Sequence, residues 1–278
     1  MNKQPTIIEI KNFLAEDIGS GDITASIIPI TRQACAKVIT REKMVLCGQA
    51  WFESVFKTLN PDIQIDWLKA EGEVCEADTL ICQLKGSARD LLTGERTALN
   101  LLQTLSSTAT VAKQYADAVL GTQCKVLDTR KTIPGLRDAQ KYAVTCGGCM
   151  NHRTGLYDGI LIKENHIMAA GSIANAIYSA RKISDVLLEV EVESLDEFQQ
   201  AISAKPDRIM LDNFSNADMK TAVSLKPEGI ELEASGDITL ETIRKVAETG
   251  VDYISIGALT KHVKAVDLSM RITMETAE

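Results

Sequence analysis

The sequence has no continuous run of about 18 apolar residues, so it predicts no transmembrane helix. Its N-terminus lacks the apolar core of a secretory signal and turns acidic at once. The chain also has no excess of basic residues, because 30 Lys and Arg stand against 38 Asp and Glu, for a net charge of −8. Such a balance argues against nucleic acid as a partner. We therefore expect a globular cytoplasmic protein that binds neither nucleic acid nor a membrane.

The cysteines do not form the even, regularly spaced set of a disulfide framework. There are seven, at positions 35, 47, 75, 82, 124, 146 and 149. We expect reduced thiols, as in a cytoplasmic protein. Cys146-Gly-Gly-Cys149, followed by His152, would allow a metal or redox site, but no second cysteine pair with zinc-site spacing exists. We favour a glycine-rich turn with two small buried thiols.

The first part of the chain mixes helical and strand-like patterns. Apolar residues recur with helical spacing over residues 7–18, over residues 50–59 and from residue 88 onward. Strand-like runs lie at residues 36–40, 44–47, 63–67 and 80–84. This pattern predicts an α+β domain with a mostly antiparallel sheet. We place it at residues 1–110 and a second domain at residues 111–278, whose last helix could return to the first domain.

The second part alternates regularly between strand and helix. Strands are predicted at residues 125–128, 159–163, 187–192, 208–212, 229–234 and 253–257, and helices at 136–144, 173–183, 195–202, 216–223 and 240–249. Repeated βα units indicate a parallel sheet. Six or seven such units fit an α/β barrel that is closed or nearly closed, and an open doubly wound sheet is the alternative.

Basic side chains are concentrated between Asp128 and His166, in Thr129-Arg130-Lys131-Thr132, His152-Arg153 and Lys163-Glu164-Asn165-His166. A local basic cluster in an acidic protein is better explained by a pocket for a small, highly charged anion than by a polyanion surface. Several polar residues and one glycine fall at the carboxyl ends of predicted strands: Arg130, Lys131, Lys163, Glu191, Asp212, Ser235 and Gly257. Parallel α/β folds bind ligands at that edge, whichever topology is right.

Two features of these strand ends suggest phosphate and metal chemistry. Glu191 and Asp212 end neighbouring strands, and carboxylates facing a phosphate site commonly hold Mg²⁺. Because strands alternate, residues 189, 191 and 193 share one face, and the sequence leaves the choice among these three glutamates open. The last two strands end in the small-residue segments 233–237 and 255–260, where backbone N–H groups can approach an anion.

Several long motifs, each present once, are spread along nearly the whole chain. They are Glu16-Asp-Ile-Gly-Ser-Gly-Asp-Ile-Thr24, Glu95-Arg-Thr-Ala-Leu-Asn100, Asp128-Thr-Arg-Lys-Thr132, Pro134-Gly-Leu-Arg137, Lys141-Tyr-Ala-Val144, Asn151-His-Arg153, Leu161-Ile-Lys-Glu-Asn-His-Ile167 and Ile256-Gly-Ala-Leu-Thr260. Together they closely resemble the quinolinate phosphoribosyltransferases. The resemblance implies an N-terminal α/β sandwich, a C-terminal incomplete α/β barrel, and a homodimer or a higher oligomer of dimers. It also implies a pentosyltransferase that joins quinolinate to phosphoribosyl pyrophosphate (PRPP) with Mg²⁺, giving nicotinate mononucleotide, pyrophosphate and CO₂ in NAD biosynthesis.

The resemblance also implies a role for each residue of the basic cluster. Arg96 looks like the arginine that one subunit donates to its partner's quinolinate. Arg130, His152, Arg153 and Lys163 resemble the residues that grip the two carboxylates, with Thr129 beside them. Lys131, Glu191 and Asp212 resemble the catalytic group around ribose, pyrophosphate and Mg²⁺, with the two carboxylates holding the metal directly or indirectly. Ser235, Gly236 and Gly257 resemble the loops around the 5′-phosphate.

The chain departs from the family pattern at a few positions. Cys149, Ser107 and Asp237 stand where the family usually has glycine, and Lys261 stands where it has histidine. These departures keep two alternatives open: a related PRPP-dependent barrel enzyme acting on another small acid, and a catalytically silent anion-binding homologue. Intact Lys131, Glu191 and Asp212 argue against the silent homologue.

Overall fold

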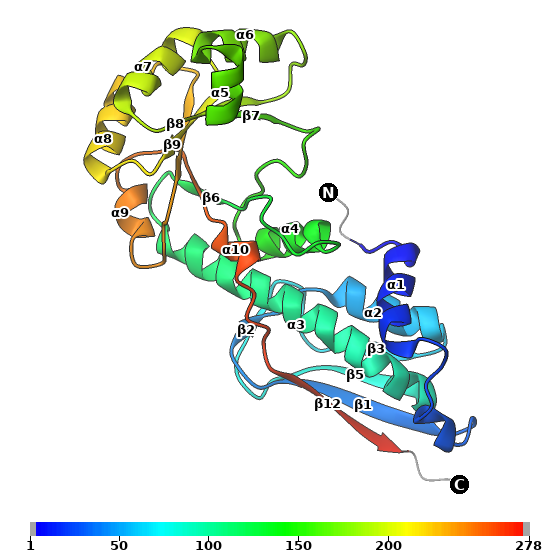
Figure 1. Cartoon of the computed structure of the whole chain (residues 1–278). Helices are drawn as coiled ribbons and strands as arrows, with labels where there is room; N and C mark the ends of the chain where they lie inside the picture. The colour runs from blue at the N-terminus through cyan, green and yellow to red at the C-terminus, as the bar shows by residue number, and fades with distance from the viewer. Residues whose placement is uncertain (1–3, 275–278) are drawn as a thin grey trace. The chain divides into compact units, whose positions relative to one another are not determined.

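The computed structural model describes residues 4–274 and consists of two compact units (Figure 1). Unit 1 comprises Met1–Lys113, Asp138–Gly148 and His262–Glu278, and unit 2 comprises Gln114–Arg137 and Cys149–Lys261. Each unit is therefore assembled from separate stretches of the chain, whereas the sequence prediction used a single boundary after residue 110. No helix in the described part of the chain is long and apolar enough to span a membrane.

Unit 1 is built on a four-stranded antiparallel sheet in the order β12-β1-β5-β3. Its strands are β1 (Gln33–Thr40), β3 (Gln64–Trp67), β5 (Leu80–Ser87) and β12 (Leu268–Met274), and a small second sheet pairs β2 (Met44–Val45) with β4 (Val74–Cys75). Exposed and buried residues alternate along β1, as expected of a strand with one face on the core. The antiparallel prediction is confirmed, but the last described element is the strand β12, which pairs with β1, and not the returning helix that we considered.

The helices of unit 1 follow the apolar periodicity of the sequence. They are α1 (Ile7–Ile18), the short η1 (Ala25–Ile27), α2 (Gln49–Leu59), the start of the long α3 (Ala88–Ala118), and all but the first residue of α4 (Arg137–Cys146). Thr6 and Glu9 form a capping box that fixes the start of α1. The sequence prediction had counted α4 as a helix of the barrel, whereas the structure assigns nearly all of it to unit 1.

Unit 2 contains a six-stranded parallel sheet in the order β6-β11-β10-β9-β8-β7. The strands are β6 (Lys125–Leu127), β7 (Ile160–Ile162), β8 (Leu188–Val192), β9 (Arg208–Asp212), β10 (Glu231–Ser235) and β11 (Tyr253–Ser255). Residues in β8, β9 and β10 are mostly buried, as in a sheet covered on both faces. No pairing between β6 and β7 is found among the described residues, so the predicted incomplete barrel is confirmed, with its opening between these strands.

Helices connect these strands, and serine caps fix where three of them begin. The helices are α5 (Glu164–Ala170), α6 (Ile173–Arg181), α7 (Leu195–Ala204), α8 (Asn216–Leu225), α9 (Ile243–Ala247) and α10 (Ala258–Lys261). Ser172, Ser194 and Ser215 each accept a hydrogen bond from the backbone N–H three residues later. These caps set where α6, α7 and α8 begin, and for α7 and α8 they lie two or three residues past the carboxyl ends of β8 and β9. The short helix α5, directly after β7, was not predicted from the sequence.

The caps provide a test of local stability. Ser194→Ala removes the acceptor at the start of α7 and should cost about 1 kcal/mol, lowering the melting temperature by about 2–4 °C. Ser203→Ala is the matched control, since that exposed hydroxyl only bonds back to Gln199 O within the same helix. The control should leave the melting temperature unchanged or slightly higher, because alanine is the better helix former. Equal melting temperatures for the two variants would contradict this account.

Candidate active site

A cavity of about 430 Å³ opens at the carboxyl ends of the parallel strands in unit 2. Its lining residues come from the end of every strand of the sheet and from the loop that carries His152 and Arg153. They are Thr129, Arg130, Lys131, His152, Arg153, Leu161, Lys163, Glu191, Met210, Asp212, Glu233, Ser235 and Ser255. Parallel pairing aligns these ends, since Ser235 lies opposite Asp212 across β10 and β9. The structure thus brings Arg153 and Lys163 into one cavity, together with most of the residues proposed from the sequence.

The positive charges of the cavity are held close together. Burial lowers the pKa of the Arg153 guanidinium, and the nearby charge of Arg130 lowers it further. Arg153 Nη1 donates to Gly159 O at 3.0 Å. The Nε of Arg130 is buried and has no hydrogen-bond partner among the residues that the structure describes. Mutual repulsion and an unsatisfied donor are both relieved by an anion, so this part of the cavity is suited to a carboxylate or phosphate.

The loop that carries His152 and Arg153 is anchored by a buried aspartate at the end of β6. Asp128 is fully buried. One of its carboxylate oxygens accepts from the His152 backbone N–H at 2.9 Å, and the other accepts from Asn151 Nδ2 at 2.6 Å. Met150 forms a parallel bridge with Leu127. Asp128 therefore sets the position of the basic loop relative to β6.

The three glutamates of β8 and its end lie at different depths. Glu189 is fully buried, the Glu191 side chain is 12% exposed and forms an ion pair with Lys163, and Glu193 is exposed. Of the three, only Glu191 lines the cavity. Asp212, at the end of the next strand, accepts from Asn213 Nδ2 at 3.0 Å. The two cavity carboxylates are the oxygen donors that a hard divalent cation prefers.

Two buried glutamates lie next to His152: Glu189, which the sequence left as one of three candidates, and Glu233, which lines the cavity but was not proposed from the sequence. Glu189 and Glu233 both have no exposed surface, and the Glu189 Oε2 and Glu233 Oε2 atoms lie 2.7 and 3.5 Å from His152 Nε2. Burial raises the pKa of Glu189 to about 7, and burial together with the neighbouring Glu189 raises that of Glu233 to about 8. The strand pattern identified the face of Glu189 but not its depth.

The remaining predicted site residues lie beside the cavity or outside it. Gly236 has φ +103°, and a Cβ there would lie 2.1 Å from Asn213 Oδ1, so the turn requires glycine. A Cβ on Gly257 would lie 3.2 Å from Lys131 Cδ. Neither glycine is a lining residue. Arg96 is exposed on α3 in unit 1, and its donation to a partner subunit stays a prediction.

The departures from the family pattern have simple local settings. Cys149 is a buried residue of unit 2 whose pKa is raised to about 12 by burial, so it is a neutral thiol. Cys146 belongs to unit 1, where its sulfur lies near Cys47 and Glu71. Ser107 Oγ donates to Lys264 O at 2.6 Å. Asp237 has φ +42°, a conformation that favours the glycine of the family pattern.

Fold and cavity together define an incomplete α/β barrel with a basic cavity, suited to anions, at the carboxyl ends of its strands. The chain belongs to the quinolinate phosphoribosyl transferase family: residues 22–106 match its N-terminal domain and residues 108–271 its C-terminal domain. It is 42% identical over 268 residues to a probable nicotinate-nucleotide pyrophosphorylase (carboxylating) of Bacillus subtilis, covering 95% of this chain and 92% of that one. A solved nicotinate-nucleotide pyrophosphorylase of Francisella tularensis is 48% identical, with a TM-score of 0.93 and 98% of each chain covered. NadC of Streptococcus pyogenes is 38% identical, with a TM-score of 0.92 and 96% of each chain covered.

The buried carboxyl groups predict how stability depends on pH. A carboxyl whose pKa is about 8 in the folded protein and about 4.3 when unfolded stabilises the fold fully below the lower value. That contribution is lost as the pH rises toward the higher value. Glu233→Gln cannot ionise, so between about pH 5 and about pH 9 the melting temperature of the wild type should fall by about 2–4 °C or more relative to this variant. Parallel curves would contradict the raised pKa, and exposed Glu248→Gln is the control.

Proposed function

We propose that this protein transfers the phosphoribosyl group of PRPP to quinolinate and releases pyrophosphate and CO₂ to give nicotinate mononucleotide, a step of NAD synthesis. The observation that carries the proposal is the single cavity in which Arg130, Arg153 and Lys163 face Glu191 and Asp212. The names of the relatives support the same substrate and reaction. A doubly negative pyridine beside a polyphosphate needs this density of fixed cations.

The cavity residues suggest how the reaction proceeds. Arg130, Arg153 and Lys163 would bind the two carboxylates and direct the pyridine nitrogen toward C1 of the ribose, while Lys131 would neutralise the pyrophosphate. As pyrophosphate leaves, positive charge develops at C1, and Glu191 and Asp212 would stabilise it. Attack by the pyridine nitrogen gives a quaternary nitrogen, which stabilises the electron pair left on C2 when the bond to the 2-carboxylate breaks and CO₂ departs. C2 then takes a proton from water, which gives the product.

Mg²⁺ is the metal that this reaction would use. When bound, it supplies positive charge to the pyrophosphate leaving group. The oxygen donors of Glu191 and Asp212 fit such an ion, although Glu191 also forms an ion pair with Lys163. We propose these two carboxylates as the metal-holding residues, directly or through water.

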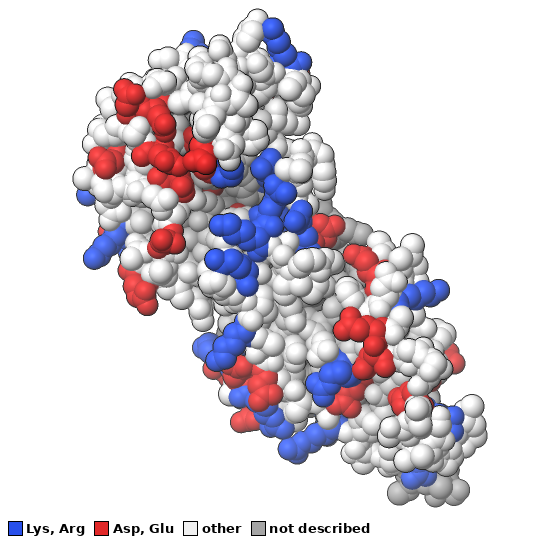
Figure 2. All heavy atoms as spheres, in the orientation of Figure 1, with Lys and Arg blue, Asp and Glu red and all other residues white. Residues whose placement is uncertain are grey.

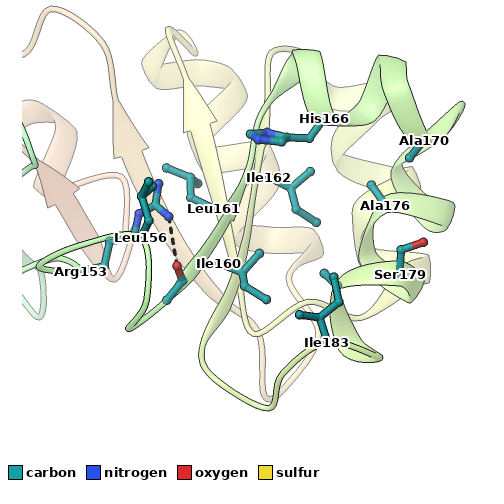
Figure 3. A pocket seen from close by; sticks show the side chains of 12 residues that line it. Arg153, Leu156, Ile160, Leu161, Ile162, His166, Ala170, Ala176, Ser179 and Ile183 are labelled. Atoms are coloured by element: carbon teal, nitrogen blue, oxygen red, sulfur yellow. Dashed lines mark hydrogen bonds between the residues drawn. The ribbon is translucent and has the colours of Figure 1, made fainter.

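A homodimer is the proposed working form, with Arg96 of each subunit completing the partner's cavity. A hollow of about 320 Å³ between β7 and the helices α5 and α6 supports a protein contact in unit 2. Figure 3 shows Ile160, Ile162 and Ile183 pointing into this hollow. Leu156 and Ile183, which also line it, are 74% and 81% exposed. Exposed apolar side chains gathered at one place commonly mark a protein interface.

The cytoplasm is the proposed location of the enzyme. No disulfide joins any of the seven cysteines, all of which lie in the described part of the chain. Reduced thiols are usual in that compartment. Among the relatives, plant proteins carry chloroplastic or mitochondrial names, so location varies within the family.

Turnover of quinolinate tests the activity directly. We expect CO₂ release from quinolinate only when PRPP and Mg²⁺ are both present. Lys163→Ala should reduce kcat/KM for quinolinate by about a hundredfold, because losing a charged partner of a bound anion costs about 2–5 kcal/mol. Lys220→Ala, an exposed lysine on α8, is the control and should match the wild type. Binding of quinolinate without CO₂ release would identify a silent anion-binding homologue. Turnover of nicotinate but not of quinolinate, with PRPP present, would identify an enzyme with a different substrate.

Mixing two inactive variants tests the shared site. Arg96→Ala and Lys163→Ala would each disable every site of a homodimer. A mixed dimer, however, regains one intact site, because one subunit supplies Lys163 and the other Arg96. Random co-assembly should therefore restore about a quarter of wild-type activity. An inactive mixture of folded, co-expressed subunits would contradict donation of Arg96 across the dimer.

A further inference from the structure

Two fully buried glutamates, one of which lines the cavity that is suited to anions, have no task in the proposed reaction. Glu189 lies on β8 and Glu233 on β10, on either side of β9. In each, Oε2 approaches His152 and Oε1 has no hydrogen-bond partner among the described residues. Burying a carboxylate is costly unless its contacts compensate. These contacts therefore identify what the pair holds in place.

The hydrogen bonds of His152 fix its tautomer. The backbone N–H of Arg153 donates to His152 Nδ1 at 2.8 Å, so Nδ1 acts as an acceptor and carries no proton. The ring proton is then on Nε2, which lies 2.7 Å from Glu189 Oε2 and donates to it. The imidazole thus links the buried carboxylate to the main chain of Arg153. Both ring nitrogens contact protein atoms, and the side chain is only 9% exposed.

Arg153 is consequently held at both ends. Its backbone N–H is bound by the imidazole, and its guanidinium Nη1 donates to Gly159 O at 3.0 Å. A side chain that is fixed at two points loses little freedom when it binds an anion. The orientation of this guanidinium depends on the chain of contacts from Glu189 through His152.

Arg208, at the start of β9, supplies the compensating charge below the two glutamates. Its Nη1 lies 3.3 Å from Glu233 Oε2, while its Nη2 lies 2.9 Å from Glu231 Oε2. The guanidinium also lies over the Tyr253 ring, 3.9 Å from the centroid. A cation is therefore already in place beside Glu233. The ligand atoms of His152, Glu189 and Glu233 lie within 4.8 Å of one another, but the Nε2–H of His152 is already directed at Glu189, and the Arg208 guanidinium already lies beside Glu233.

We propose that Glu189 is a positioning residue of the quinolinate site, which acts through His152 to orient Arg153 toward the substrate. Glu233 and Arg208 complete the buried support. The inference rests on the proposed function, because the substrate that Arg153 binds is taken to be quinolinate. It assigns to His152 a role in orienting Arg153, in addition to the substrate contact that the resemblance implies.

The test compares variants of Glu189 that keep or lose the acceptor. Glu189→Leu preserves volume but cannot accept from His152, and we expect KM for quinolinate to rise about tenfold while KM for PRPP changes by less than about twofold. Glu189→Gln keeps an amide oxygen as acceptor and should stay within about threefold of the wild type. Exposed Glu193→Ala, from the end of the same strand, is the matched control. Equal effects of the Leu and Gln variants, or a parallel rise in both KM values, would overturn the proposal.

A double-mutant cycle distinguishes action through Arg153 from an independent effect. Arg153→Lys weakens the site but keeps its charge. If Glu189 acts through Arg153, adding Glu189→Leu to Arg153→Lys should change kcat/KM for quinolinate by less than about twofold. If the losses in kcat/KM of the two single variants multiply in the double variant, the role of Glu189 is overturned, whereas the proposed function of the enzyme still stands. Absence of quinolinate turnover in the wild type would instead overturn the proposed function.

Variants of His152 also test whether the Glu189–His152 contact orients Arg153. They replace the Glu189 test if Glu189→Leu does not fold. His152→Asn can place an amide oxygen near the former Nδ1, whereas His152→Phe keeps only the ring shape. A positioning role predicts that Asn retains most of the affinity for quinolinate, measured by titration calorimetry, and that Phe loses about tenfold. Equal losses in both variants would overturn it. A metal site would also overturn the positioning role, and it would appear as one equivalent of bound metal in the purified wild type that is missing from Glu189→Gln.

Discussion

The parallel alignment of six strands is the constraint on which the site depends, because it brings like charges to one edge of a sheet. Arg130, Lys131, Arg153 and Lys163 come from three separate segments, yet all line one cavity. Bringing guanidinium groups together out of water is unfavourable, as the lowered pKa of Arg153 shows. The buried carboxylates of Asp128 and Glu189 hold the basic loop in that position from below. On the surface, acidic and basic side chains gather at different places: Figure 2 shows acidic side chains over α7 and α8 and a distinct group of Lys and Arg side chains.

The opening of the barrel gives the basic loop its freedom to reach the cavity. No strand pairing joins β6 to β7 in the described chain, and the segment between them contributes nearly all of α4 to unit 1. Residues 149–159 then return to unit 2, where Met150 bridges to Leu127 before His152 and Arg153 enter the cavity. A usual crossover helix between β6 and β7 would have packed on the sheet and placed the two strands side by side. Less room would then have been left for such a loop. The incomplete barrel and the position of Arg153 are therefore two consequences of one connection.

Periodicity predicted most of the fold, and the strand ends predicted most of the cavity. Both succeed because alternation and helical spacing report which face of an element is apolar. What periodicity cannot report is depth, as Glu189 and Glu191 show: they share a face, yet one lies below the cavity and the other lines it. Arg208 is the first residue of a predicted strand, and only the three-dimensional pairing of β9 with β10 brings it to Glu233. The strand β12 was missed because its partner β1 lies at the other end of the chain.

Charge balance within the cavity decides which cations are available to an anion. Lys163 forms an ion pair with Glu191, and both side chains line the cavity. Their charges offset each other, so attraction toward the two anionic substrates comes first from Arg130, Lys131 and Arg153. Of these, Arg130 has a buried donor without a partner among the described residues, and Arg153 is oriented by His152. An acidic protein can thus bind a highly charged anion, because in a partly desolvated cavity the orientation of a few cations matters more than the sign of the total charge.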